Sequence, residues 1–192
     1  MNFDDVIRSA YAHEGDSPRP RAAYWDDIGS PVGRIHVASG DDGRVRRIAF
    51  RIDRESFVDG LLAAGWLPLR DREANVALES QLAEYFEGAR RRFDLDCDLD
   101  SLSPFTRAVL DYTATVHPGD WETYGGLAAM IGRPRAARAV GNALGDNPIP
   151  IVIPCHRILA ARGRIGGYGS RMRGGIEIKR FLLGLEGVHP PP

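Results

Sequence analysis

Apolar and polar positions follow a strand-like period in three short stretches between positions 22 and 52. Turn residues separate the stretches, at Gly29-Ser30-Pro31 and again at positions 40–43. Short strand-type runs bounded by glycine, proline and aspartate are typical of hairpin-connected strands. The pattern predicts a small antiparallel sheet near the start of the chain.

The spacing of apolar residues becomes helical after this sheet. Helices are predicted over positions 55–64 and 74–90, because apolar residues in the second stretch recur three and four positions apart. From 92 to 99 apolar residues then alternate strictly with acidic ones, which predicts a half-buried strand. Cys97 falls on the apolar side of that strand, where it is expected to act as a small buried hydrophobic residue.

Helix-start signals recur after position 100. Ser103 followed by Pro104 predicts a capped helix to about position 116, and Thr123 is expected to cap a second helix over 124–131. A third helix is predicted over 134–144, after a short glycine-containing turn. Two short helices joined in this way are typical of a helix-turn-helix. We therefore expect an α+β protein with an extension over 1–21, a sheet-and-helix domain over 22–100 and a helical domain over 101–192.

The third predicted helix has two different faces. One stripe is apolar and comprises Ala137, Val140 and Leu144. The opposite stripe is polar and comprises Arg135, Arg138 and Asn142. Such a stripe is often only a solvated face, but on the second helix of a helix-turn-helix it equally favours contact with DNA.

Charge is distributed unevenly along the chain. Residues 1–100 hold 14 arginines and 20 acidic residues, a net charge of -6, whereas the remainder holds 11 basic and 6 acidic residues, a net charge of +5. A basic half favours a nucleic-acid partner, although two ordinary solvated surfaces would have the same composition.

Composition narrows the class of protein. With 43% hydrophobic and 27% charged residues and no long apolar run, the chain is typical of a soluble globular protein, and we expect no membrane partner. The acidic N-terminus is unlike a signal peptide, so a cytoplasmic location is expected. Two cysteines without a CxxC pair and five scattered histidines predict no disulfide framework, no metal and no cofactor.

The chemistry of the chain is concentrated around Cys155. The run Asn-Pro-Ile-Pro-Ile-Val-Ile-Pro-Cys-His-Arg over 147–157 places three prolines before adjacent thiol, imidazole and guanidinium groups. Prolines restrict the backbone, and a neighbouring base can convert a thiol into a nucleophile. A buried cysteine is nevertheless often inert, so the run alone leaves both interpretations open.

Four short sequence motifs in a fixed order distinguish a nucleophilic Cys155 from an inert one. They are TYGGLA at 123–128, RAVGN at 138–142, PCHR at 154–157 and LEG at 185–187. Together with Asn147-Pro148 and the glycine loop at 166–169, they resemble the O6-alkylguanine-DNA alkyltransferases over positions 105–187. The resemblance implies a ribonuclease H-like lead domain followed by a winged-helix-like domain. Residues 1–100 match that family only as a strand-rich lead domain.

The resemblance also implies roles for individual residues. Cys155 would take the alkyl group from guanine O6 in a single irreversible displacement, with O4-alkylthymine as a candidate second substrate. His156 would receive the thiol proton through a water, Glu186 would orient the imidazole, and Asn147 would brace the helix-turn-helix against the segment that carries Cys155. Tyr124 would supply a hydrogen-bond donor to the leaving base.

Further residues are implied in binding the substrate, which would be double-stranded DNA containing alkylated guanine. Arg138 would enter the base stack in place of the extruded nucleotide. The rest of the DNA surface would comprise Arg135, Ala136, Ala137, Asn142 and Tyr124. The base pocket would comprise Arg157, Ile158, Tyr168 and Gly169. The protein would act as a monomer.

The chain departs from the family pattern at Asp111, usually aromatic, in the acidic lead-in over 117–122, and at 170–173, which look inserted. Two other functions are open to such a sequence. A lesion-binding module without transfer is disfavoured because Cys155, His156 and Glu186 are all present. A helix-turn-helix transcription regulator is disfavoured because it has no use for a proline-fixed Cys-His pair.

Overall fold

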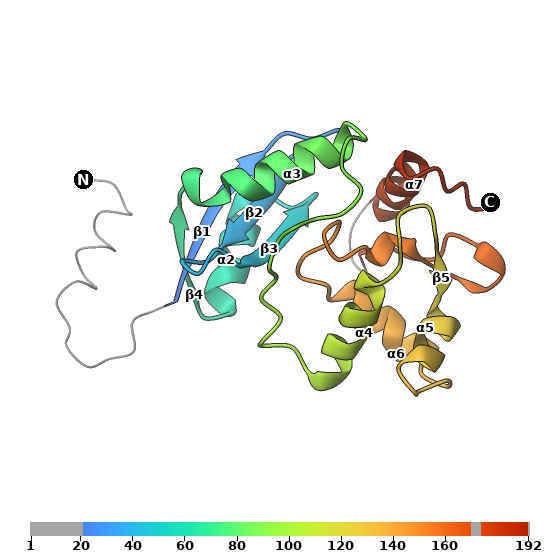
Figure 1. Cartoon of the computed structure of the whole chain (residues 1–192). Coiled ribbons are helices and arrows are strands. Elements are labelled where there is room, and N and C mark those ends of the chain that lie inside the picture. Colours follow the sequence, from blue (N-terminus) through green and yellow to red (C-terminus); the bar gives the residue numbers. More distant parts are fainter. Residues whose placement is uncertain (1–20, 170–173, 192) are drawn as a thin grey trace, which may run out of the picture.

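The computed structural model describes residues 21–169 and 174–191, and Figure 1 shows a sheet-bearing N-terminal half beside a helical C-terminal half. Of the extension predicted over 1–21, only Arg21 is described, and it begins the first strand. The insertion predicted over 170–173 lies outside the described residues.

The first three strands form the predicted antiparallel sheet. β1 (Arg21–Ile28), β2 (Ile35–Ser39) and β3 (Val45–Phe50) pair in sequence order, which confirms this prediction. A fourth strand, β4 (Trp66–Arg70), pairs parallel with β1 and gives the order β3-β2-β1-β4. β4 was not predicted, because its five residues show no alternation and include Pro68, which an edge strand tolerates.

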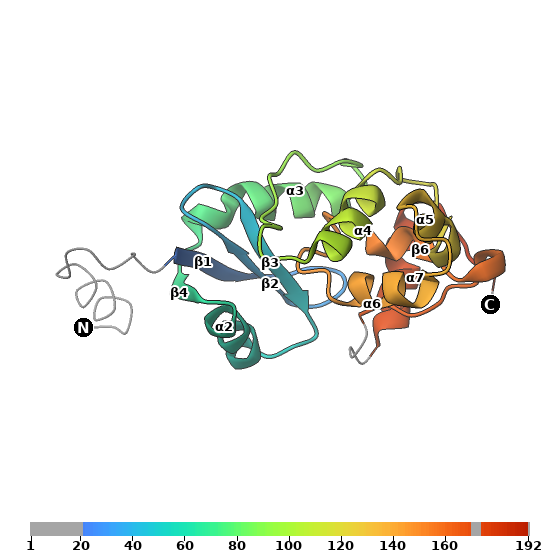
Figure 2. The same ribbon diagram turned by 90° about the horizontal axis from the view of Figure 1, so that it is seen from below.

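Helices α2 (Arg54–Ala63) and α3 (Val76–Phe86) confirm the two helical predictions of this half, and a single 3-10 turn, η1 (Glu73–Asn75), precedes α3. They cover opposite faces of the sheet (Figure 2). Under α2, Phe57 is buried in a small cluster with Trp25, whereas the buried side chains of α3 join the main core.

The predicted strand over 92–99 is wrong except for one bridge, between Val45 and Cys97. Burial does alternate, with Phe93 and Leu95 half-buried and Asp94 and Asp96 exposed. The ladder stops because the next edge position of β3 is taken from elsewhere: the backbone N–H of Ile48 donates to the carbonyl of Pro148 at 2.9 Å. Cys97 itself is half-buried and not fully buried.

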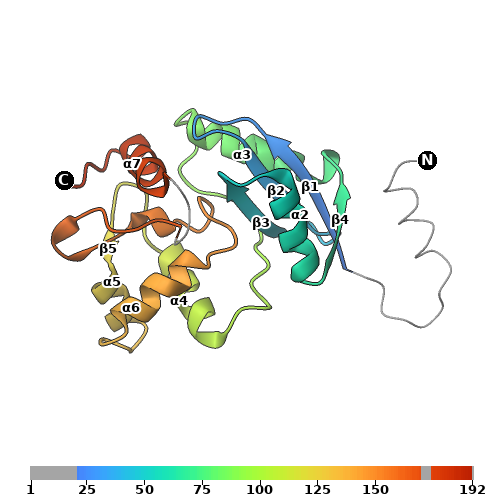
Figure 3. The same cartoon turned by 180° about the vertical axis from the view of Figure 1, so that it is seen from behind.

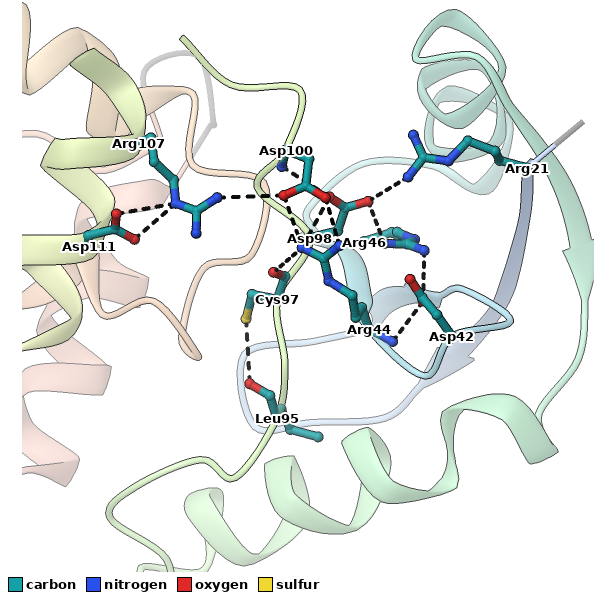
Figure 4. A network of polar contacts seen from close by, with 10 residues as sticks. All are labelled: Arg21, Asp42, Arg44, Arg46, Leu95, Cys97, Asp98, Asp100, Arg107 and Asp111. Atoms are coloured by element: carbon teal, nitrogen blue, oxygen red, sulfur yellow. Dashed lines mark hydrogen bonds and ion pairs between the residues drawn. The ribbon is translucent and has the colours of Figure 1, made fainter. Parts of the chain in front are cut away.

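Side chains hold this segment where backbone pairing does not (Figure 4). Asp98 accepts from Arg46 and, at 3.2 Å, from Arg21, and it lies 3.5 Å from Arg44. Arg44 in turn pairs with Asp100 at 2.7 Å. We refer to Arg21, Asp42, Arg44, Arg46, Asp98 and Asp100 as the Asp98 network.

Four α-helices follow, α4 (Pro104–Ala114), α5 (Tyr124–Met130), α6 (Ala137–Gly145) and α7 (Gly175–Leu185). The predicted caps are confirmed, because Ser103 accepts from the backbone of Thr106 and Thr123 from that of Gly126. β5 (Glu122–Thr123) pairs parallel with β6 (Ile158–Leu159). Two 3-10 turns flank β6, namely η2 (Cys155–Arg157) and η3 (Ala161–Gly163).

The start of α6 corrects the sequence analysis. The helix begins at Ala137 and not at Pro134, because the N–H of Ala136 closes a turn onto the carbonyl of Arg133 at 2.8 Å. Gly132, with φ 71°, turns the chain just before it. Arg135 and Ala136 therefore lie in the turn ahead of the helix.

The two halves share one apolar core. Buried residues of β2 and β3, such as Val37 and Phe50, belong to the same cluster as Val140 of α6 and Leu182 of α7. Figure 3 shows this arrangement from behind, with the sheet beside the helical half. Among the described residues, no helix is long and apolar enough to cross a membrane.

Candidate active site and nucleic-acid interface

Cys155 opens η2, directly after Pro154, and the residue as a whole is 7% exposed. The approach to it is tightly folded: Ile153 donates its backbone N–H to Ile149 at 2.9 Å, and Ile151 adopts φ 76°. A β-branched residue with a left-handed backbone is strained and persists only where the surroundings enforce it. The thiol is therefore held by a stiff segment.

Asn147 ties the two ends of this segment together. Its Nδ2 donates to the Ile153 carbonyl at 3.0 Å and lies 3.2 Å from the Cys155 sulfur, and its Oδ1 accepts from the Ile149 backbone at 3.0 Å. All three contacts lie within residues 147–155, directly after α6, so one amide stiffens the segment that carries Cys155.

Burial raises the pKa of the Cys155 thiol, while the Asn147 amide and the charge of Lys179 act in the opposite direction. The raised pKa keeps the resting thiol protonated. A nearby base is then needed to generate the thiolate.

Glu186 lies at the C-cap of α7 and collects donors from three directions. His156 Nε2 lies 3.1 Å from Oε1, and Arg157 binds both carboxylate oxygens at 2.8 Å. The Tyr85 hydroxyl of α3, from the N-terminal half, donates to Oε1 at 2.8 Å. The side chains of His156 and Glu186 are fully buried.

These contacts define the proton positions. Burial by itself would raise the pKa of Glu186, but donation from His156 and Arg157 holds that pKa far below its usual value, so the group is a carboxylate. A carboxylate only accepts, so Nε2 of His156 carries the shared proton. Burial lowers the pKa of His156, which keeps the imidazole neutral and leaves a lone pair on Nδ1. That nitrogen has no hydrogen-bond partner within the described part of the chain.

A cavity of about 570 Å³ opens onto the Cys155 sulfur, a volume in the range of small-ligand sites. It lies between α5, α6 and the glycine loop. Its lining includes Tyr124, Gly125, Ala137, Arg138, Gly141, Asn142, Tyr168 and Gly169. A second cavity of about 410 Å³ reaches Cys155 from the β3 side, between Phe50 and Pro148.

Seven of the predicted site residues line this cavity, namely Tyr124, Ala137, Arg138, Asn142, Cys155, Tyr168 and Gly169. The other seven do not line it, namely Arg135, Ala136, Asn147, His156, Arg157, Ile158 and Glu186. Arg138 and Asn142 are exposed on α6, whereas Ala137 is half-buried. The placement of Arg157 in the base pocket is wrong, because its guanidinium faces Glu186 and the Val116 carbonyl. Ile158 is fully buried behind the cavity.

Lys179 is a site residue that the sequence analysis missed. Its ammonium is buried, donates to the carbonyls of Ile158 at 2.5 Å and Gly167 at 3.1 Å, and lies 5.7 Å from the Tyr124 ring centroid. Burial lowers the pKa of Lys179 to about 8. A sequence signal existed, because Lys179 is the single lysine among 25 basic residues.

The Tyr124 hydroxyl donates to the Gly167 carbonyl at 3.1 Å, at the mouth of the cavity. Within residues 21–169 and 174–191, no three His, Cys, Asp or Glu side chains are grouped to hold a metal ion. The chemistry that this arrangement offers is nucleophilic, because the thiol of Cys155 is followed in sequence by a neutral imidazole that is hydrogen-bonded to a buried carboxylate.

Comparison with known proteins agrees with this chemistry. Residues 104–188 match the family described as "6-O-methylguanine DNA methyltransferase, DNA binding domain". A methylated-DNA--protein-cysteine methyltransferase of Mycolicibacterium paratuberculosis is 47% identical over 164 residues, covering 85% of this chain and 92% of that protein.

Solved structures are similar over both halves. The O6-methylguanine methyltransferase of Mycobacterium tuberculosis aligns with a TM-score of 0.71 at 34% identity, over 88% of this chain and 96% of that one. A structure of the M. tuberculosis protein OGT in complex with DNA aligns with a TM-score of 0.70 at 35% identity, over 85% and 92% of the two chains.

Proposed function

The chain belongs to the methylated-DNA--protein-cysteine methyltransferase family, whose function is direct-reversal DNA repair, and we propose that Cys155 is its alkyl acceptor. The observation that carries this assignment is that Cys155 lines the cavity and is followed directly by His156, whose buried imidazole is hydrogen-bonded to the buried Glu186 carboxylate. Cys97 is half-buried and lies outside that cavity.

The proposed reaction is a single displacement. His156 Nδ1 receives the thiol proton, directly or through a water, and the ionised Glu186 stabilises the resulting imidazolium. The sulfur–carbon bond forms as the bond between carbon and guanine O6 breaks, and the electron pair of that bond stays on the base. Tyr124 would turn its hydroxyl from Gly167 to the leaving guanine. Each protein molecule reacts once, because the thioether remains.

The target base must leave the duplex, because the thiol of Cys155, a residue that is 7% exposed and lines a cavity, cannot reach a stacked base. The exposed Arg138 at the cavity mouth would fill the gap in the stack. We assign the rest of the DNA surface to Arg135, Ala136, Ala137, Asn142 and Tyr124. We assign the base pocket to Tyr168 and Gly169, and propose O6-alkylguanine as the main substrate with O4-alkylthymine as a candidate.

We also propose the finer features of the fold and setting. A four-stranded sheet with a helix on each face supports a ribonuclease H-like lead domain. Helices α5 and α6 beside the β5–β6 pair support a winged-helix-like second domain, with the boundary at 100/101. The protein would act in the cytoplasm, as a monomer, on double-stranded DNA.

The test is the intact mass of the protein after incubation with duplex DNA containing O6-methylguanine. We expect an increment of one methyl group in the wild type and in Cys97→Ala, the matched control, and none in Cys155→Ala. Binding to the methylated duplex without any mass increment would instead identify a lesion-binding module. An increment that survives in Cys155→Ala would refute the assignment.

A further inference from the structure

Among the described residues of the N-terminal half, which begin at Arg21, Tyr85 contributes the one side-chain hydroxyl that is hydrogen-bonded to the buried pair of His156 and Glu186. Tyr85 is fully buried on α3, with its ring 5.4 Å from Phe93 and 5.6 Å from Phe86 between centroids. Its hydroxyl donates to Glu186 Oε1 at 2.8 Å across 101 positions of sequence. No other side chain of the sheet-bearing half has a described hydrogen bond to Glu186, His156 or Arg157.

The hydrogen bond from Tyr85 reaches the carboxylate oxygen that also contacts His156, the proposed general base. Oε1 is also the oxygen that accepts the proton of His156 Nε2, at 3.1 Å. A donor on the same oxygen fixes its position and withdraws charge from it. Burial, and then the charge of Glu186, raise the pKa of Tyr85 well above its usual value, so the hydroxyl stays a neutral donor throughout the range in which histidine titrates.

We propose that Tyr85 is a positioning residue for alkyl transfer, acting through Glu186 on His156. Its donation limits how strongly Oε1 attracts the imidazolium, and so keeps His156 available as a neutral base. The sheet-bearing half thereby completes the active site through one hydroxyl group. This inference rests on the function proposed above.

The sign of the effect follows from the charge on Oε1. Without the hydroxyl, the carboxylate charge is less dispersed and stabilises the imidazolium more. The pKa of His156 then rises, and the neutral base is lost at a higher pH. The acid limb of the pH profile should therefore move to higher pH, a shift that loss of packing alone would not produce.

The experiment measures single-turnover methyl transfer from duplex DNA containing O6-methylguanine, at saturating DNA, as a function of pH. For Tyr85→Phe we expect a rate constant lower by about tenfold at neutral pH, as for the loss of one hydrogen bond to a charged group, together with the upward shift of the acid limb. Tyr24→Phe, on β1 of the same half, is the matched control and should change neither quantity.

Because each protein reacts once, the reaction amplitude counts folded molecules and the rate constant reports the chemistry. A Tyr85→Phe protein that is partly unfolded loses amplitude and still yields a rate constant. If the wild type shows no amplitude, the proposed function fails; if the wild type reacts and Tyr85→Phe keeps its rate and profile, only the role of Tyr85 fails.

A double-substitution cycle tests the route through Glu186. In a Glu186→Gln background, the further change Tyr85→Phe should alter the rate by less than about twofold, because the carboxylate on which it acts is gone. An undiminished tenfold loss in that background would show that Tyr85 acts independently of Glu186 and would overturn the proposal.

Discussion

Glu186 and Asp98 are both carboxylates that gather donors from distant parts of the chain, yet their surroundings differ. The Glu186 side chain is fully buried, and so is most of its partner Arg157, which is 6% exposed. Asp98 is nearly as buried, at 6%, and its partner Arg46 is 3% exposed, but its other partners Arg21 and Arg44 are 60% and 28% exposed.

This difference determines what each cluster can do. Around Asp98, water can replace Arg21 or Arg44 while the buried Arg46 still pairs with the carboxylate, so each of these two exposed pairs contributes little to stability. Around Glu186, water cannot enter freely, so each donor is needed to hold the carboxylate in its ionised form. The Asp98 network therefore holds the segment around Asp98 against the sheet, whereas the Glu186 cluster can impose a fixed protonation state on His156.

Removing Arg157 should have the largest effect on stability. Arg157→Ala leaves the buried Glu186 charge uncompensated, and we expect a loss of ~3–5 kcal/mol in the free energy of unfolding. The measurement is urea unfolding followed by circular dichroism.

The double variant Arg157→Met with Glu186→Gln removes both charges together and should recover much of that loss. If it is as unstable as Arg157→Ala alone, the cost comes from packing and the contrast with Asp98 is lost.

A smaller effect is expected on the way in which the free energy of unfolding decreases at acid pH. The folded-state pKa of Glu186 lies below its usual value of 4.5, so the carboxylate contributes stability that is present above this pH and lost as the pH falls below it. Glu186→Gln lacks this term, and its urea midpoint should fall less steeply than that of the wild type between about pH 5 and pH 2. Asp100→Asn, at an exposed member of the Asp98 network, is the control. An equal flattening in both variants would contradict the distinction.

The smallest effect belongs to the Asp98 network itself. Arg44→Ala should cost no more than ~1 kcal/mol, and the cost should shrink as sodium chloride is added, because exposed pairs are screened. The loss in Arg157→Ala should be nearly independent of salt. Urea unfolding of both variants at low and high salt makes the comparison, and a salt-independent loss in Arg44→Ala would show that the network is effectively buried.

Local signals were the ones that sequence predicted well. The caps at Ser103 and Thr123 depend on residues three positions away, and both are confirmed. The strand β4 was missed and the strand over 92–99 was wrong, because pairing along a sheet depends on which edge is free, and the Pro148 carbonyl occupies part of that edge.

In the candidate site, too, local sequence signals were predictive and contacts between distant positions were not. The order of the short motifs pointed to Cys155, His156 and Glu186. Arg157 was assigned to the base pocket, because its actual partner, Glu186, lies 29 positions away in the sequence. Tyr85 lies within the helix predicted over 74–90, and nothing in that stretch of sequence points to Glu186. Lys179 could have been noticed as an isolated lysine among arginines.

That single lysine has a practical consequence. Because Lys179 is fully buried, the folded protein presents no lysine amine at its surface. Amine-directed reagents should therefore leave Lys179 of the native protein unmodified. Labelling at Lys179 would then report unfolding, since the ammonium becomes accessible only when α7 separates from the core.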